Sequence, residues 1–281
     1  MANGSEREAW AGDLGLTWAR LWPDLDLLTA AATALLIERA DLRQGARVLD
    51  VGCGAGHSTL AAARAVGPTG HATGLDLSAA LLAAARDRAA AEGVGNVAFV
   101  EGDAGVDRAP GAPFDAMVSR FGTMFFDDPV AAFANVARQL RPGAPLTMVA
   151  WAAAAENPWF ALPHRLAEAR LGPAPPSDPD APGPTGFRDP ARVTALLARA
   201  GLRAAEGEAC DLDLHHPGGP SALAGLALDL GPAARLLRVK GATAEDRAAL
   251  GREIEEALAA FATSDGIRIP ARVLVYRTQT A

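Results

Sequence analysis

Cysteine is scarce in this sequence, since only Cys53 and Cys210 occur among 281 residues and they lie far apart. Two such cysteines exclude a disulfide framework and a cysteine-based metal site, and they predict a protein of a reducing compartment, the cytoplasm. Long apolar runs are missing as well: no stretch of about twenty uninterrupted apolar residues predicts a membrane-spanning helix. Residues 1–13 carry charges of both signs and lack the apolar core of a secretion signal.

Blocks of positive charge are also absent. The chain carries 26 Lys and Arg residues against 33 Asp and Glu residues, a net charge of −7. This balance argues against nucleic acid as a partner and leaves a small molecule as the expected one. The length suits one α/β domain with an insertion. A homodimer stays open at this point.

The most informative segment that is present spans residues 46–56. A short apolar run ends in an acid and continues as D-x-G-x-G-x-G, formed by Asp50, Gly52, Gly54 and Gly56. This pattern predicts a buried strand, a tight loop that lets a ligand approach the backbone, and a helix start. In the dinucleotide fingerprint the third glycine comes one position later. Asp50 would repel a pyrophosphate, but it can accept hydrogen bonds from a cationic amino-acid group.

A second acid follows at nucleotide-site spacing. The segment 71–76 predicts a second strand that ends at Asp76, followed by Leu77 and a helix capped by Ser78. An acid at this point grips a ribose diol in nucleotide-binding α/β folds, so we expect Asp76 and Leu77 to bind the ribose. The alternative is a plain loop acid beside a helix start, where the helix dipole favours negative charge.

The strand–helix rhythm then continues. We expect further strands over 97–101, 114–119, 146–151, 202–214 and 272–278, with Asp128-Pro129 and Asp189-Pro190 starting helices. Residues 172–186 contain six prolines, which forbid a continuous helix there.

Together these motifs resemble the class I S-adenosylmethionine-dependent methyltransferases, in the small-molecule branch related to ubiquinone/menaquinone-biosynthesis enzymes. The likeness rests on the glycine loop, Asp76, Gly102-Asp103-Ala104, residues 119–135, Leu140-Arg141-Pro142-Gly143 and Trp151 with Glu156-Asn157-Pro158-Trp159, in family order. Ala144 departs from that branch, which usually repeats glycine there. No Asn/Asp-Pro-Pro-aromatic motif follows the fourth strand, which further disfavours a nucleic-acid enzyme.

The resemblance implies a Rossmann-like, seven-stranded, mostly parallel sheet with an antiparallel last strand inserted between strands five and six. It implies S-adenosylmethionine as cofactor, S-adenosylhomocysteine as product, and no metal. Asp103 and Ala104 would hold the adenine, and Ser119 and Arg120 would lie near the methyl-transfer face. The acceptor would be a quinone precursor, a phenolic compound or another secondary metabolite.

Three segments are expected. Residues 1–44 form a helical cover, residues 45–216 and 266–281 form the core, and residues 217–265 form a helical lid that walls the acceptor site. Trp10 and Trp18 in the cover are candidates for contact with the sulfonium, although most tryptophans at helical spacing simply pack.

No catalytic residue stands out. Several side chains could serve as a general base: His57, His164, His215, His216 and Tyr276. Each is more often structural. Two other functions stay open: a non-catalytic S-adenosylmethionine-binding regulator and an NAD-dependent oxidoreductase.

Overall fold

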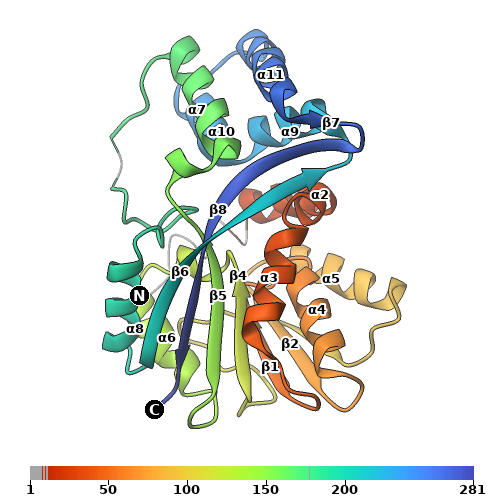
Figure 1. The fold of residues 1–281 in the computed structure, drawn as a ribbon, viewed down its shortest axis with the longest axis vertical. Coiled ribbons are helices and arrows are strands. Elements are labelled where there is room, and N and C mark those ends of the chain that lie inside the picture. Colours follow the sequence, from red (N-terminus) through yellow and green to blue (C-terminus); the bar gives the residue numbers. More distant parts are fainter. Residues whose placement is uncertain (1–7, 9, 11, 177) are drawn as a thin grey trace.

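One large sheet forms the centre of the molecule (Figure 1). The computed structural model describes residues 8, 10, 12–176 and 178–281. The strands, in chain order, are β1 (Arg47–Val51), β2 (His71–Asp76), β3 (Val97–Glu101), β4 (Ala116–Arg120), β5 (Pro145–Trp151), β6 (Arg203–His216), β7 (Ala262–Thr263) and β8 (Gly266–Gln279). Their spatial order is β3-β2-β1-β4-β5-β8-β6, with the short β7 paired to β8.

The sheet confirms the predicted fold class. β1 to β5 pair in parallel, and β8 runs antiparallel between β5 and β6. The seven predicted strands are present, with β7 as a two-residue addition.

Helices cover both faces of the sheet (Figure 1). The helices on one face are α3 (Ala30–Ala40), α4 (His57–Val66) and α5 (Ala79–Ala91); those on the other are α6 (Pro129–Ala137) and α8 (Pro190–Arg199). The predicted caps form: Ser78, Asp128 and Asp189 each accept a hydrogen bond from the backbone of the helix that follows. These helices thus begin after strands have ended, so the loops that join strands to helices lie at one edge of the sheet.

A second group of helices lies beyond that edge (Figure 1). It comprises α7 (Pro158–Leu171), α9 (Gly219–Asp229), α10 (Gly231–Val239) and α11 (Ala244–Leu258), which pack on one another. The boundary expected at residue 216 assigns α7 to the core, whereas α7 packs against α10 and α11. Helix α2 (Asp13–Leu28) lies between this group and the sheet edge.

The link between the two parts is a long antiparallel ribbon of β6 and β8. Both strands extend past the residues expected from the sequence, from 214 to His216 in β6 and from 272 back to Gly266 in β8. Ile267 and Ile269 of this extension are fully buried, because the helical group packs on the ribbon. Within the described ranges, no helix is long and apolar enough to cross a membrane.

Candidate functional site

A cavity lies at the carboxyl edge of the parallel strands, between the glycine loop, α2 and the α9–α10 junction. Five backbone segments contribute to its walls: residues 51–55, 75–77, 102–104, 120–122 and 124–126. Further lining residues are Trp10, Trp18, Trp22, Leu25, Asp26, Leu28, Thr29, Ser58, Leu81, Trp151, Trp159, Phe160, Pro184, Leu230 and Gly231. Ligands of open α/β sheets bind at this edge, so the cavity is the candidate site.

The glycine loop needs its glycines for different reasons. Gly52, Gly54 and Gly56 all have positive φ, at 69°, 53° and 83°. A Cβ on Gly52 would lie 2.7 Å from Cα of Gly122, so Gly52 allows two backbones to touch. A Cβ on Gly54 would meet nothing within 4 Å, because Gly54 faces the cavity. Gly54 therefore keeps that space open for a ligand.

Asp76 and Asp103 lie where the sequence places them, on the cavity wall with Leu77 and Ala104. One Asp76 oxygen accepts a hydrogen bond from Gly54 N at 2.8 Å and the other from Ser78 N at 2.9 Å. Burial raises the pKa of the Asp76 carboxyl, an effect that these backbone N–H groups partly offset. Asp103 Oδ1 accepts from Gly105 N at 2.7 Å, which fixes the turn after β3.

Three expected site residues do not line the cavity: Asp50, Gly56 and Ser119. Ser119 is fully buried and donates to the carbonyl oxygen of Val51 at 2.7 Å, so it joins β4 to β1. Gly56 precedes α4, and a Cβ there would lie 3.0 Å from Ala85 and Phe99. The structure therefore gives Gly56 and Ser119 packing roles behind the cavity wall.

Asp50 is buried behind the glycine loop with an incomplete set of hydrogen bonds. Its Oδ2 accepts from Ser58 Oγ at 2.7 Å and Thr59 Oγ1 at 2.6 Å. Its Oδ1 is buried and has no hydrogen-bond partner among the described residues. Burial raises the pKa of Asp50 to about 6, although the two hydroxyls partly counteract it. An unsatisfied buried carboxylate oxygen beside Ser58, which does line the cavity, suits a cationic ligand group.

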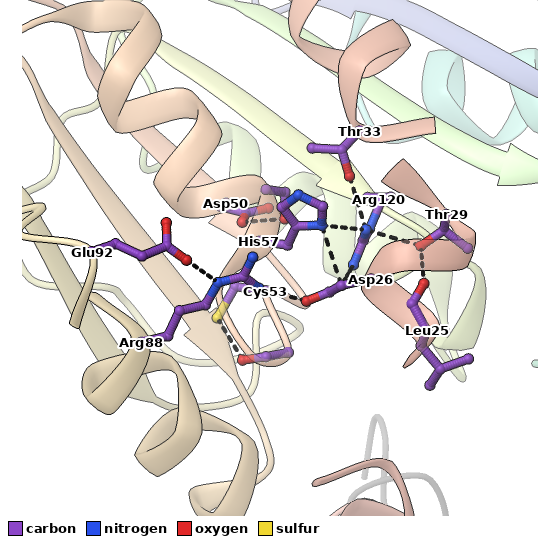
Figure 2. Close-up of polar contacts among 12 residues, drawn as sticks. Leu25, Asp26, Thr29, Thr33, Asp50, Cys53, His57, Arg88, Glu92 and Arg120 are labelled. Atoms are coloured by element: carbon purple, nitrogen blue, oxygen red, sulfur yellow. Dashed lines mark hydrogen bonds and ion pairs between the residues drawn. The ribbon is translucent and has the colours of Figure 1, made fainter. Parts of the chain in front are cut away.

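Arg120 lines the cavity inside a charged cluster (Figure 2). Its guanidinium donates to Asp26 Oδ1 at 2.7 Å, to Thr33 Oγ1 at 2.8 Å and to Thr29 Oγ1 at 3.0 Å. His57 Nδ1 lies 3.2 Å from Arg120 Nη1. Burial alone would raise the pKa of Asp26, but Arg120 and His57 outweigh it and hold the pKa well below its usual value. Asp26 is therefore a buried anion, and Arg120 is not a surface ion pair.

The remaining wall is aromatic. All five tryptophans of the chain line this one cavity, together with Phe121, Phe125, Phe126 and Phe160. Trp10 lies beside Trp18 with ring centroids 5.5 Å apart, and Phe121 stacks on Trp151 at 4.3 Å. Trp10 and Trp18 thus stand where the sequence predicts, in a wall that favours apolar or aromatic ligands and cations.

None of the five candidates for a general base lines the cavity. His215 lies beside Asp265, His216 beside Asp24, and His164 beside Glu168. The Tyr276 hydroxyl donates to the carbonyl oxygen of Phe187, and burial raises its pKa. His57 approaches the site through Arg120 and does not line it. Among the described residues, no group of three or more His, Cys, Asp or Glu side chains could hold a metal ion.

Several site residues escaped prediction. Asp26 and Thr29 line the cavity, and Arg88 contacts Asp26, but each looks like an ordinary helix residue in the sequence. Leu230 and Gly231 line it from the helical segment, whereas Leu223, Leu226 and Leu236 are buried and do not. For Gly231 a signal exists, since the Gly-Pro pair at 231–232 marks a junction between helices.

The sheet and its loops resemble those of a known protein family. Residues 48–143 match the family model described as a methyltransferase domain. This stretch is similar to methyltransferase domains. It holds most of β1, all of β2 to β4, the glycine loop and two of the three aspartates that line the cavity, Asp76 and Asp103.

Curated relatives match the chain over a similar number of residues. Nocamycin O-methyltransferase of Saccharothrix syringae is 36% identical over 107 residues, which cover 38% of this chain and 38% of that protein. The ubiquinone/menaquinone biosynthesis C-methyltransferase of Pseudomonas aeruginosa is 35% identical over 122 residues, 43% of this chain and 48% of that protein. The chain thus matches less than half the length of these relatives.

Solved structures share the fold over most of the chain. The YcgJ protein of Bacillus subtilis superposes with a TM-score of 0.55 at 21% identity, covering 89% of this chain and 98% of that one. Likeness at this level establishes the fold and not the reaction.

Proposed function

We propose that the protein is a methyltransferase that binds S-adenosylmethionine in this cavity and transfers its methyl group to a small organic acceptor. One observation carries the proposal: the glycine loop, Asp76, Asp103 and all five tryptophans of the chain surround the same space at the carboxyl edge of the sheet. The match of residues 48–143 to the methyltransferase domain family supports it.

The residues present fit the cofactor. Asp76 and Leu77 would hold the ribose, since a carboxylate at the end of the second strand suits a diol. Asp103 and Ala104 would hold the adenine. The cationic amino group of the cofactor would supply the hydrogen bond that Asp50 lacks, because Asp50 Oδ1 is buried and unsatisfied among the described residues. Gly54 offers the open space through which the backbone meets the ligand.

The cofactor would supply a methyl group on a positively charged sulfur. The protein's own part is to exclude water and to align the acceptor, which together account for several powers of ten in rate. Tryptophan faces attract a cation, so the aromatic wall suits both the sulfonium and an apolar acceptor. No histidine, lysine or tyrosine occurs among the described lining residues, so none of these side chains would act as a general base in the cavity.

The acceptor side would be walled by α2, by Phe121 to Phe126 and by the α9–α10 junction. These aromatic and aliphatic surfaces favour a flat, largely apolar molecule such as a quinone precursor or a phenol. The two curated relatives carry names of an O- and a C-methyltransferase, and the cavity leaves both reactions open. Both cysteines are free thiols, which supports the cytoplasm as the location.

Calorimetry tests the cofactor assignment. S-adenosylmethionine and S-adenosylhomocysteine should bind, and NADH should not. Asp76→Asn should reduce affinity by about 1–3 kcal/mol, because a charged acceptor for the ribose hydroxyls is lost. The matched control is Asp87→Asn, an exposed aspartate of α5 that does not line the cavity.

Turnover with a panel of phenols and quinols then tests the reaction. Methyl release from S-adenosylmethionine would establish an enzyme, whereas binding without turnover across the panel would favour a regulatory protein. Wild-type affinity in Asp76→Asn would contradict the ribose assignment.

A further inference from the structure

Helix α2 supplies a large part of the cavity wall and comes from outside the methyltransferase domain. Trp18, Trp22, Leu25 and Asp26 of this helix all line the cavity. Any movement of α2 would therefore open the site. The contacts that hold α2 in place are separate from those proposed for the cofactor.

A buried attachment of α2 is the carboxylate of Asp26 (Figure 2). Asp26 is only 7% exposed, and it receives two guanidinium groups from different elements. Arg120, at the end of β4, contacts Oδ1 at 2.7 Å, and Arg88, on α5, contacts Oδ2 at 2.6 Å. Breaking one partner of a buried ion pair is costly, because the remaining charge loses its compensation away from water.

Arg88 holds α2 at two points. Besides the Asp26 contact, its guanidinium carbon lies 5.2 Å from the ring centroid of Trp22, one helical turn before Asp26. Its Nε donates to Glu92 Oε1 at 2.7 Å, which orients the side chain from its own helix. Arg88 does not line the cavity, so its contacts with α2 are separate from any contact with a ligand.

Arg120 extends the same attachment to the junction of α2 and α3. It donates to Thr29, which lies between the two helices, and to Thr33 in the first turns of α3. The cluster thus fixes the end of α2 to β4 and α5 at once.

We propose that Asp26 and Arg88 are positioning residues that clamp α2 over the cavity, so that its tryptophan wall is assembled before a ligand binds. The clamp rests on the proposed function only for the identity of that ligand. If the closed position were populated only fractionally, the apparent dissociation constant would rise by the inverse of that fraction.

Arg88→Gln tests the clamp with a matched control. Arg64→Gln also removes a cation from Glu92, but Arg64 lies on α4 and is half exposed. Arg88→Gln should increase acrylamide quenching of tryptophan fluorescence and speed hydrogen exchange in residues 13–28. It should raise the dissociation constant of S-adenosylhomocysteine about tenfold, as expected if α2 is closed only about a tenth of the time. Arg64→Gln should leave all three measurements at wild-type values.

A second variant covers the case in which Arg88→Gln acts through stability alone. Asp26→Asn removes the shared anion and leaves Arg88 only its contact with Trp22, so Arg88→Gln should change quenching and affinity less in this background than in the wild type. Additive effects, or an Arg88→Gln variant that behaves like Arg64→Gln, would overturn the clamp. If the wild-type protein failed to bind S-adenosylhomocysteine, the proposed cofactor would be wrong, while quenching and hydrogen exchange would still decide the clamp.

Discussion

At the scale of single residues, Asp50 is a buried acid whose hydrogen bonds the described residues leave incomplete. Two hydroxyls satisfy Oδ2, whereas Oδ1 has no partner among the described residues. Its raised pKa and its unsatisfied oxygen share one cause, the removal of the carboxylate from water. A cationic donor that reaches Oδ1 would form a charge-assisted hydrogen bond with it.

The pH dependence of binding follows from the pKa of about 6 for Asp50. Because this pKa is raised, the folded protein holds a proton that the unfolded chain has lost, and the unfolding free energy falls as pH rises from about 4 to 6. A cationic ligand favours the carboxylate, so S-adenosylhomocysteine should bind more tightly as pH rises through 6 and should release a proton. Calorimetry at pH 6 in two buffers of different ionisation enthalpy measures that proton.

Asp50→Asn should abolish the proton release and flatten the pH profile, while Asp87→Asn should keep both. A wild-type affinity that does not change between pH 5 and 7 would contradict the role of Asp50.

Residue roles could be predicted where the backbone dictates them. Gly52 and Gly54 need positive φ, and Asp76 ends a strand at fixed spacing from the loop, so the sequence shows all three. Asp26 and Arg88 are 62 residues apart, and their contact exists only because α2 packs on α5. Ser119 was expected in the site because the family resemblance implies a place near the methyl-transfer face. Its hydroxyl instead donates to a neighbouring carbonyl oxygen, that of Val51.

At the scale of elements, the helical segment meets the cavity at a junction and not along a helix face. Leu223, Leu226 and Leu236 are buried, and they do not line the cavity. Helical spacing predicts which residues are apolar, but it does not say whether they face a ligand or another helix. The turn between α9 and α10 brings Leu230 and Gly231 to the cavity instead.

Leu230→Ala tests whether this junction shapes the acceptor side. Loss of the side chain should raise the KM for the acceptor about tenfold and leave the affinity for S-adenosylhomocysteine within about twofold, because Leu230 lies apart from the residues proposed for adenosine. Leu228→Ala, a half-buried neighbour outside the cavity, is the control. An equal loss of cofactor and acceptor binding would contradict the assignment.

At the scale of the whole molecule, the cavity is shared by parts that the sequence presents as separate. The loops that follow β1, β2, β3 and β4 supply one wall, α2 supplies another, and α7 with the α9–α10 junction supplies a third. The outer end of the ribbon was not predicted, because β8 begins at Gly266, before the strand expected over 272–278. A ligand in this cavity would touch all three parts and so stabilise their assembly.

Ligand binding should therefore raise the melting temperature of the whole chain. A ligand at 100 times its dissociation constant adds about 2.7 kcal/mol to the unfolding free energy, which corresponds to a shift of roughly 5 °C for a protein of this size. S-adenosylhomocysteine should produce that shift in a thermal melt, and NADH should not. Gly54→Ala should lose the shift, because its new Cβ points into the ligand space. It should remain folded, because that Cβ meets no atom within 4 Å and the strain of alanine at a φ of 53° costs only about 1–2 kcal/mol. Gly52→Ala should lower the melting temperature even without ligand, because its Cβ would lie 2.7 Å from Gly122. An equal shift with NADH, or a full shift in Gly54→Ala, would contradict the placement of the cofactor against the glycine loop.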